Sequence, residues 1–136
     1  MIHFDTSYLV DLLRERQRDE RGPAHGLLEG LPAEEEGCLS VHALCELLIG
    51  VELAQQPARE RERVRHLVSS LSVALPDEDV FPETYARLLA HVQRRGTPVA
   101  TMDLLIGTAA VQASAPLVTR NPQHFRPIPD LEVRTY

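Results

Sequence analysis

Three acidic residues stand inside or beside apolar stretches of the chain, where a charge is costly. Asp5 follows the first apolar stretch, Glu46 interrupts the run Leu44–Ile49, and Asp103 precedes Leu104-Leu105-Ile106. A carboxylate that is partly withdrawn from water needs a cation, a hydrogen-bond donor or a proton to compensate for the loss. The chain has no lysine, since all 14 of its Lys+Arg residues are arginine. A divalent metal ion, which prefers oxygen ligands, is therefore the simplest partner that all three acids could share.

Two of these acids also have an ordinary structural explanation. Asp5 and Thr6 are residue types that cap the N-terminus of a following helix. With Thr101 as a cap, Asp103 falls in the first turn of a helix, where a negative charge interacts favourably with the helix dipole by about 0.3–1 kcal/mol. Taken singly, each of these acids fits a structural role as well as a chemical one.

Glu46 is harder to explain as a structural residue. Leu44, Leu47, Leu48 and Val51 form the apolar stripe of a helix, and Glu46 lies on the opposite face. That face is not polar, because it also carries Ile49, Gly50 and Leu53. Glu46 therefore faces either a partner surface or a polar pocket bordered by apolar packing.

Length and composition indicate one globular domain, residues 1–136, with 43% hydrophobic and 25% charged residues. No apolar run is long enough to span a bilayer, and the N-terminus lacks the pattern of a signal peptide, so we expect a cytoplasmic protein without a membrane partner. The net charge of -6 excludes a broad basic surface for nucleic acid. It does not exclude a nucleic-acid enzyme, because metal ions can supply positive charge where a phosphate approaches.

Short apolar strands alternate with helical patterns along the chain, which predicts an α/β domain with a mainly parallel sheet of four to five short strands. We expect strands at 2–4, 38–41, 73–75, 117–118 and 131–133, and helices at about 7–18, 23–31, 44–53, 57–70, 82–95 and 101–113.

The carboxyl ends of parallel strands meet at one edge of a sheet, where binding sites form. Asp5 ends the first predicted strand, and Asn121 follows the fourth through Thr119-Arg120. Glu46 and Asp103 lie near the starts of helices that could begin at the same edge. The sequence thus allows these four residues to meet.

In this order, four segments resemble the successive motifs of PIN domains, and within them those of VapC-type toxins of bacterial type II toxin–antitoxin pairs. The segments are Phe4-Asp5-Thr6-Ser7-Tyr8-Leu9-Val10, Ser40-Val41 leading into Glu46-Leu47 and Gly50, Thr101-Met102-Asp103-Leu104-Leu105-Ile106-Gly107, and Leu117-Val118-Thr119-Arg120-Asn121-Pro122-Gln123-His124-Phe125. The resemblance covers nearly the whole chain, and it implies a PIN-like three-layer α/β/α domain.

The resemblance also implies an endoribonuclease that depends on Mg²⁺ or Mn²⁺ and cleaves RNA phosphodiesters with metal-activated water. Asp5, Glu46 and Asp103 match the acidic positions of the family, with Asp5 and Asp103 as the expected metal ligands and Glu46 as a third member or general base. Asn121 stands where some members carry an acid, which puts a second metal ion in doubt. Gly107 replaces the alanine that is common in its motif.

Further residues and partners follow from the same resemblance. Thr6 matches a small hydroxyl residue beside the first acid, and Thr119 and Arg120 are candidates for supporting the site or contacting substrate, because arginine suits phosphate. We expect an RNA substrate, a homodimer and a cognate antitoxin. The acidic pocket could attract an antitoxin arginine in place of metal.

Three other interpretations compete with this one. Cys38, His42 and Cys45 suggest zinc, but no fourth ligand has the spacing of a zinc module, and core packing suits both cysteines better. An Asp5-based phosphotransfer protein would resemble receiver or dehalogenase-like domains, which rely on a lysine that this chain lacks. A catalytically weak PIN-like module for binding or oligomerisation remains open, and it is favoured if Glu46 and Asp103 face solvent or interfaces instead of one another.

Overall fold

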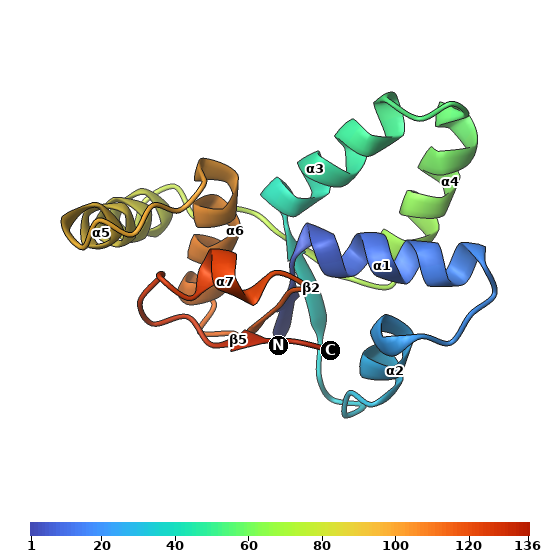
Figure 1. The fold of residues 1–136 in the computed structure, drawn as a ribbon, viewed down its shortest axis with the longest axis horizontal. Helices are drawn as coiled ribbons and strands as arrows, with labels where there is room; N and C mark the ends of the chain where they lie inside the picture. The colour runs from blue at the N-terminus through green and yellow to red at the C-terminus, as the bar shows by residue number, and fades with distance from the viewer.

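The computed structural model describes all 136 residues as an α/β fold (Figure 1). The strands are β1 (Ile2–Phe4), β2 (Gly37–Ser40), β3 (Ser72–Ala74), β4 (Leu117–Val118) and β5 (Val133–Arg134). The helices are α1 (Thr6–Gln17), α2 (Pro23–Glu29), α3 (Val41–Glu52), α4 (Pro57–Val68), α5 (Val80–Arg94), α6 (Thr101–Gln112) and α7 (Pro122–Phe125).

All five strands run parallel in one sheet of order β3-β2-β1-β4-β5. The chain builds outward from β1 through β2 to β3, and then crosses back to place β4 and β5 on the other side of β1. The direction of winding therefore reverses between β1 and β4. In open parallel sheets this reversal opens a crevice at the carboxyl ends of the strands, where ligands bind.

Helices cover both faces of the sheet, which makes a three-layer α/β/α arrangement. Figure 1 shows α5 and α6 on one side and α1, α2 and α4 on the other, while α3 packs against α1, α4 and α6. The three central strands are almost wholly buried, whereas the edge strands β3 and β5 are partly exposed. This burial explains why β4 is apolar without alternation, as strands covered on both faces are, and it also leaves the polar His3 of β1 buried. The predicted fold class is confirmed.

Packing of the first strand and helix holds the N-terminal motif in place. The rings of Phe4 and Tyr8 stack with their centroids 4.6 Å apart, and the Tyr8 hydroxyl donates a hydrogen bond of 2.9 Å to the Ala24 carbonyl at the start of α2. Both aromatic residues are buried. Asp5 is thereby fixed between a strand and a helix that cannot move independently.

The predicted elements all form, and most begin or end within one to three residues of the expected positions. The fifth strand was expected at 131–133 and is observed at Val133–Arg134. The short helix α7 was not predicted, although Pro122 opens it at a position where proline suits a helix start. Cys38 is buried as expected, but Cys45 is exposed, so the core-packing prediction is wrong for Cys45. No helix is both long and apolar enough to cross a membrane.

Gly107 sets the distance between α6, which carries Asp103, and the segment after α7. A Cβ atom at this glycine would lie 2.6 Å from Cδ1 of Ile128 and 3.8 Å from Cδ1 of Phe125. Gly107 and Ile128 are both buried. The missing side chain therefore allows the C-terminal segment to pack closely against the helix of the third acid.

We predict that Gly107→Ala destabilises the protein by about 1 kcal/mol, because overpacking of about 1–3 kcal/mol outweighs the gain of about 1 kcal/mol in helix propensity. In an Ile128→Val background, which removes the clashing Cδ1, the same substitution should become stabilising. Urea unfolding of the wild type, the two single variants and the double variant measures the coupling energy between positions 107 and 128. An equal effect of Gly107→Ala in both backgrounds would contradict the packing argument.

Candidate active site

Asp5 lies at the reversal point of the sheet and is almost fully buried. Its backbone N–H donates to the Val118 carbonyl at 2.9 Å, which joins the ends of β1 and β4. Its side chain does not cap α1. Instead, Oδ2 accepts hydrogen bonds of 2.7 Å from the hydroxyls of Ser7 and Thr119. The capping explanation is therefore wrong for the Asp5 side chain, which faces the carboxyl edge of the sheet.

Glu46 reaches the same edge from the second turn of α3. Ser40, at the end of β2, caps this helix by accepting a hydrogen bond of 3.1 Å from the Ala43 N–H. The Glu46 carboxylate accepts a hydrogen bond of 2.9 Å from the Thr6 hydroxyl. Burial raises its pKa, the Thr6 hydrogen bond opposes this, and the charges of Asp5 and Asp103 raise it further. Glu46 therefore points into a polar pocket.

Asp103 lies in the first turn of α6, as predicted, but the N-cap of that helix is Ala100 instead of Thr101. Burial raises its pKa, and the charge of Asp5 raises it further. His124 on α7 opposes both effects, since its Nδ1 lies 3.4 Å from Oδ2 of Asp103. Asp5, Glu46 and Asp103 thus lie near enough for their charges to influence one another.

The loop after β4 joins the site through Thr119 and Asn121. Thr119 is buried, donates to Asp5 and accepts a hydrogen bond of 3.0 Å from the Asn121 N–H. The side-chain amide of Asn121 forms no hydrogen bond, so it is available at the rim of the site. Thr119 therefore links the Asp5 carboxylate to the backbone of Asn121.

Arg120 is held beside the site by a separate network. Its backbone N–H donates to the Ser7 hydroxyl at 3.1 Å, and its Nη1 donates to Asp11 Oδ1 at 2.7 Å. Asp11 also accepts a hydrogen bond of 2.6 Å from the hydroxyl of Tyr136. Because an arginine has five N–H donors in a planar fork, Arg120 keeps most of them free for a phosphate.

The donor chemistry of the site fits a hard divalent cation. Asp5, Glu46 and Asp103 offer only carboxylate oxygens, and burial together with mutual repulsion raises the pKa of two of them. As the side chains stand, no group of three His, Cys, Asp or Glu residues is arranged to hold a metal ion. To share one ion, the carboxylates would therefore have to come closer to one another than they stand here.

Sequence reasoning missed four residues of this site: Ser7, Asp11, His124 and Tyr136. Ser7 could have been found, because a hydroxyl two residues after an aspartate readily bonds back to it. His124 lies within a quoted motif, but only the path of α7 brings it to Asp103. No local pattern connects Tyr136 with Asp11, which lies 125 residues earlier.

We predict that Asp103→Asn raises thermal stability at pH 7 in the presence of EDTA. Folding raises the pKa of Asp103, so the unfolded chain loses this proton at a lower pH than the folded protein does. The stability of the folded protein therefore falls as the pH rises from the unfolded pKa to the folded pKa. The amide removes this penalty, and each kcal/mol gained should raise Tm by about 2–5 °C. The difference should vanish below about pH 3, where the acid is protonated in both states. A lower Tm at pH 7 than that of the wild type would contradict the prediction.

Comparisons with known proteins identify the family of the chain. The PIN domain family model matches residues 2–130. "Ribonuclease VapC1" of Rickettsia felis is 30% identical over 138 residues, which cover 96% of this chain and 92% of that protein. "tRNA(fMet)-specific endonuclease VapC" of Salmonella typhimurium is 30% identical over 99 residues, or 73% of this chain and 74% of that protein.

Two solved structures show the same fold over the full chain. VapBC2 of Rickettsia felis, bound to a DNA fragment from its promoter, superimposes with a TM-score of 0.89 at 23% identity and covers 100% of this chain and 99% of that one. VapBC-1 of nontypeable Haemophilus influenzae gives a TM-score of 0.85 at 23% identity and covers 99% of this chain and 98% of that one. The chain belongs to the PIN domain family and, within it, to the VapC-type ribonucleases.

Proposed function

We propose that the site around Asp5, Glu46 and Asp103 cleaves RNA phosphodiester bonds with the help of Mg²⁺ or Mn²⁺. As a VapC-type ribonuclease, the protein is the toxin endoribonuclease of a toxin–antitoxin pair. The observation that carries the catalytic proposal is the cluster of three carboxylates at the reversal point of the sheet, where hydroxyl groups and a histidine are their only partners.

The metal ion would be held by Asp5 and Asp103, with Glu46 as a third member. When bound, such an ion supplies positive charge to the attacked phosphate and lowers the pKa of water. The raised pKa of Glu46 makes its carboxylate a stronger proton acceptor, as a general base requires. Asp5 and Asp103 would thus bind the metal ion, and Glu46 would accept the proton.

Other residues orient these acids and the substrate. Thr119 and Ser7 fix the orientation of the Asp5 carboxylate, and Thr6 fixes that of Glu46. Arg120, anchored on Asp11, is placed to contact an RNA phosphate beside the acids. Asn121 can accept or donate a hydrogen bond at the rim, but it brings no charge to a second metal ion.

A cognate antitoxin is the expected protein partner, because the structural neighbours are toxin–antitoxin complexes. A groove of about 270 Å³ between α1, α3 and α4 supports this, since it is lined by apolar residues such as Val10 and Leu47 and contains Glu46. Such a groove suits an apolar segment whose arginine reaches the acids. We also propose a homodimer, which the exposed Ile49 and Leu53 on the second face of α3 support.

Metal binding is tested by calorimetric titration of the purified protein with MnCl₂ and MgCl₂. We expect one saturable site that is lost in Asp5→Asn and in Asp103→Asn. Thr119→Val keeps the shape of the side chain but removes the hydroxyl on Asp5, and should weaken metal affinity by about 10–100-fold. No binding to the wild type, or equal binding to all variants, would sink the metal site.

Catalysis is tested by incubating the protein and Mn²⁺ with structured and single-stranded RNA. Glu46→Gln should lower the cleavage rate by about 10²–10⁴-fold if Glu46 is the base, and Asp5→Asn should abolish cleavage. Asp19→Asn is the matched control, because Asp19 is exposed and has a positive φ that asparagine tolerates. Cleavage that survives in both active-site variants would show that a contaminating nuclease is responsible.

A further inference from the structure

Tyr136 packs against the core with its ring and reaches a polar network with its hydroxyl. The ring meets the Tyr8 ring edge-on, with centroids 4.9 Å apart and an interplanar angle of 82°. Tyr8 is fully buried and stacks on Phe4. The backbone two residues earlier is tied to the sheet, because the Thr119 N–H donates to the Arg134 carbonyl at 3.0 Å. Packing therefore sets the position of the Tyr136 hydroxyl.

This hydroxyl occupies one oxygen of the Asp11 carboxylate. It donates a hydrogen bond of 2.6 Å to Oδ2 of Asp11. Burial raises the pKa of Tyr136, and the hydrogen bond and the charge of Asp11 raise it further. The hydroxyl therefore keeps its proton at neutral pH and donates it to the carboxylate. A donor held in this way takes up part of the hydrogen-bonding capacity of Asp11.

Arg120 is bound to the other oxygen of the same carboxylate, and by one bond only. Its Nη1 donates to Oδ1 of Asp11 at 2.7 Å, and no other guanidinium nitrogen donates to a protein group. An arginine beside a carboxylate frequently forms a bidentate pair with two parallel N–H···O bonds. The Tyr136 hydroxyl opposes such pairing, because it already occupies Oδ2. Arg120 is thus held in place while most of its N–H donors remain unpaired.

The backbone of Arg120 lies two hydrogen bonds away from the Asp5 carboxylate. Its N–H donates to the Ser7 hydroxyl at 3.1 Å, and that hydroxyl donates to Oδ2 of Asp5 at 2.7 Å. Asp11 follows Ser7 on α1 by four residues, or about 6 Å along the helix axis. The Arg120 side chain is 47% exposed. Its guanidinium therefore lies in solvent, a short way along α1 from the acids.

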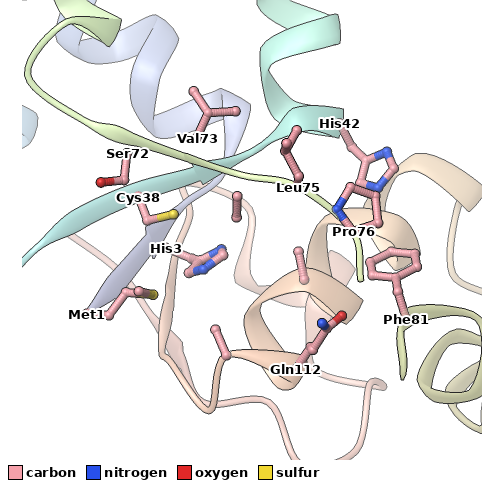
Figure 2. A pocket seen from close by; sticks show the side chains of 13 residues that line it. Met1, His3, Cys38, His42, Ser72, Val73, Leu75, Pro76, Phe81 and Gln112 are labelled. Carbon is pink, nitrogen blue, oxygen red and sulfur yellow. The ribbon is translucent and has the colours of Figure 1, made fainter. Parts of the chain in front are cut away.

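The cavity on the other face of the sheet offers no cation to a phosphate. It measures about 250 Å³, and Figure 2 shows His3 beside Cys38 at one end of it and His42 with Phe81 at the other. No arginine lines this cavity. Burial lowers the pKa of both histidines, that of His3 to about 4, so their rings are neutral at pH 7. Of these two places, only the network around Arg120 presents a cation to a phosphate.

We propose that Tyr136 is a positioning residue for RNA binding, because it limits Asp11 to a single bond with Arg120 and keeps the guanidinium free for a phosphate next to the one that is cleaved. Without the hydroxyl, both oxygens of Asp11 bind the guanidinium, and the carboxylate takes the donors that the phosphate needs. Tyr136 acts through Asp11 and Arg120 and touches no reacting group. This inference rests on the proposed RNA-cleavage function and extends it to the binding of the substrate.

The proposal is tested by the binding of a labelled single-stranded RNA, followed by fluorescence anisotropy at constant Mg²⁺. All proteins carry Glu46→Gln, which slows cleavage and leaves both expected metal ligands in place. Tyr136→Phe keeps the ring against Tyr8 and removes only the hydroxyl. We expect it to lower RNA affinity about 3–10-fold, which is the scale of one weakened hydrogen bond.

A second substitution separates positioning from a purely structural role. Asp11→Asn leaves one oxygen and no charge to compete for Arg120, so it should restore the RNA affinity of Tyr136→Phe to that of the parent protein or above. In the Asp11→Asn background, Tyr136→Phe should change the affinity by less than about twofold. Asp19→Asn removes the same charge at an exposed position just beyond the end of α1. This control should not restore the affinity.

The salt dependence of binding shows whether Arg120 itself contacts a phosphate. Each phosphate contact on a single strand contributes about 0.7 to the slope of log affinity against log salt concentration. Arg120→Ala should reduce the slope by about this amount, and Tyr136→Phe should reduce it as well. In the Arg120→Ala background, Tyr136→Phe should change neither the slope nor the affinity.

The possible failures are distinguishable. Absence of RNA binding by the parent protein would overturn the proposed function and this inference together. RNA binding that Arg120→Ala leaves unchanged in affinity and slope would overturn this inference alone. A loss of affinity in Tyr136→Phe that persists in full after Asp11→Asn would do the same, because it would show that the hydroxyl only supports the fold.

Discussion

Three carboxylates at the point where the sheet reverses its winding are the constraint around which the structure is arranged. Each is at least half-buried, and the charge of Asp5 raises the pKa of both Glu46 and Asp103. Repulsion of this kind costs stability, because the charged form is the one that burial disfavours. Hydroxyl groups on Thr6, Ser7 and Thr119 offset part of this cost without neutralising the charge. The site thus keeps its negative charge. A cation can bind there, and the bound cation can in turn attract a phosphate.

The parallel sheet makes this gathering possible. Asp5 and Thr119 follow β1 and β4, which are neighbours although more than 110 residues separate them. The C-terminal segment then reinforces the arrangement from outside. α7 brings His124 to Asp103, and Tyr136 holds Asp11, which in turn holds Arg120. Most side-chain contacts of the last 20 residues therefore help to position the acids or Arg120, whereas Asp130 pairs with Arg87 and Arg134 with Glu132 away from the site.

Much of this architecture was predictable from the sequence, because it depends on local patterns. Apolar runs bounded by turns located the strands, and helical periodicity located six of the seven helices. The three acids could be grouped because parallel strands end at one edge. Pairings between distant side chains could not be predicted in the same way. The bond from Thr6 to Glu46 depends on the crossing of α1 and α3, and the contact of His124 depends on a helix of only four residues.

The β3 edge of the sheet is exposed, and the charge around it explains how a free edge is tolerated. A free strand edge normally risks pairing with a second copy of the same chain. At the β3 edge the acids of residues 34–36 and 77–79 flank a strand of three residues, so two such edges repel each other. The arginines lie elsewhere, mainly on α1, α4 and α5. This segregation of charge disfavours pairing of two molecules through their β3 edges.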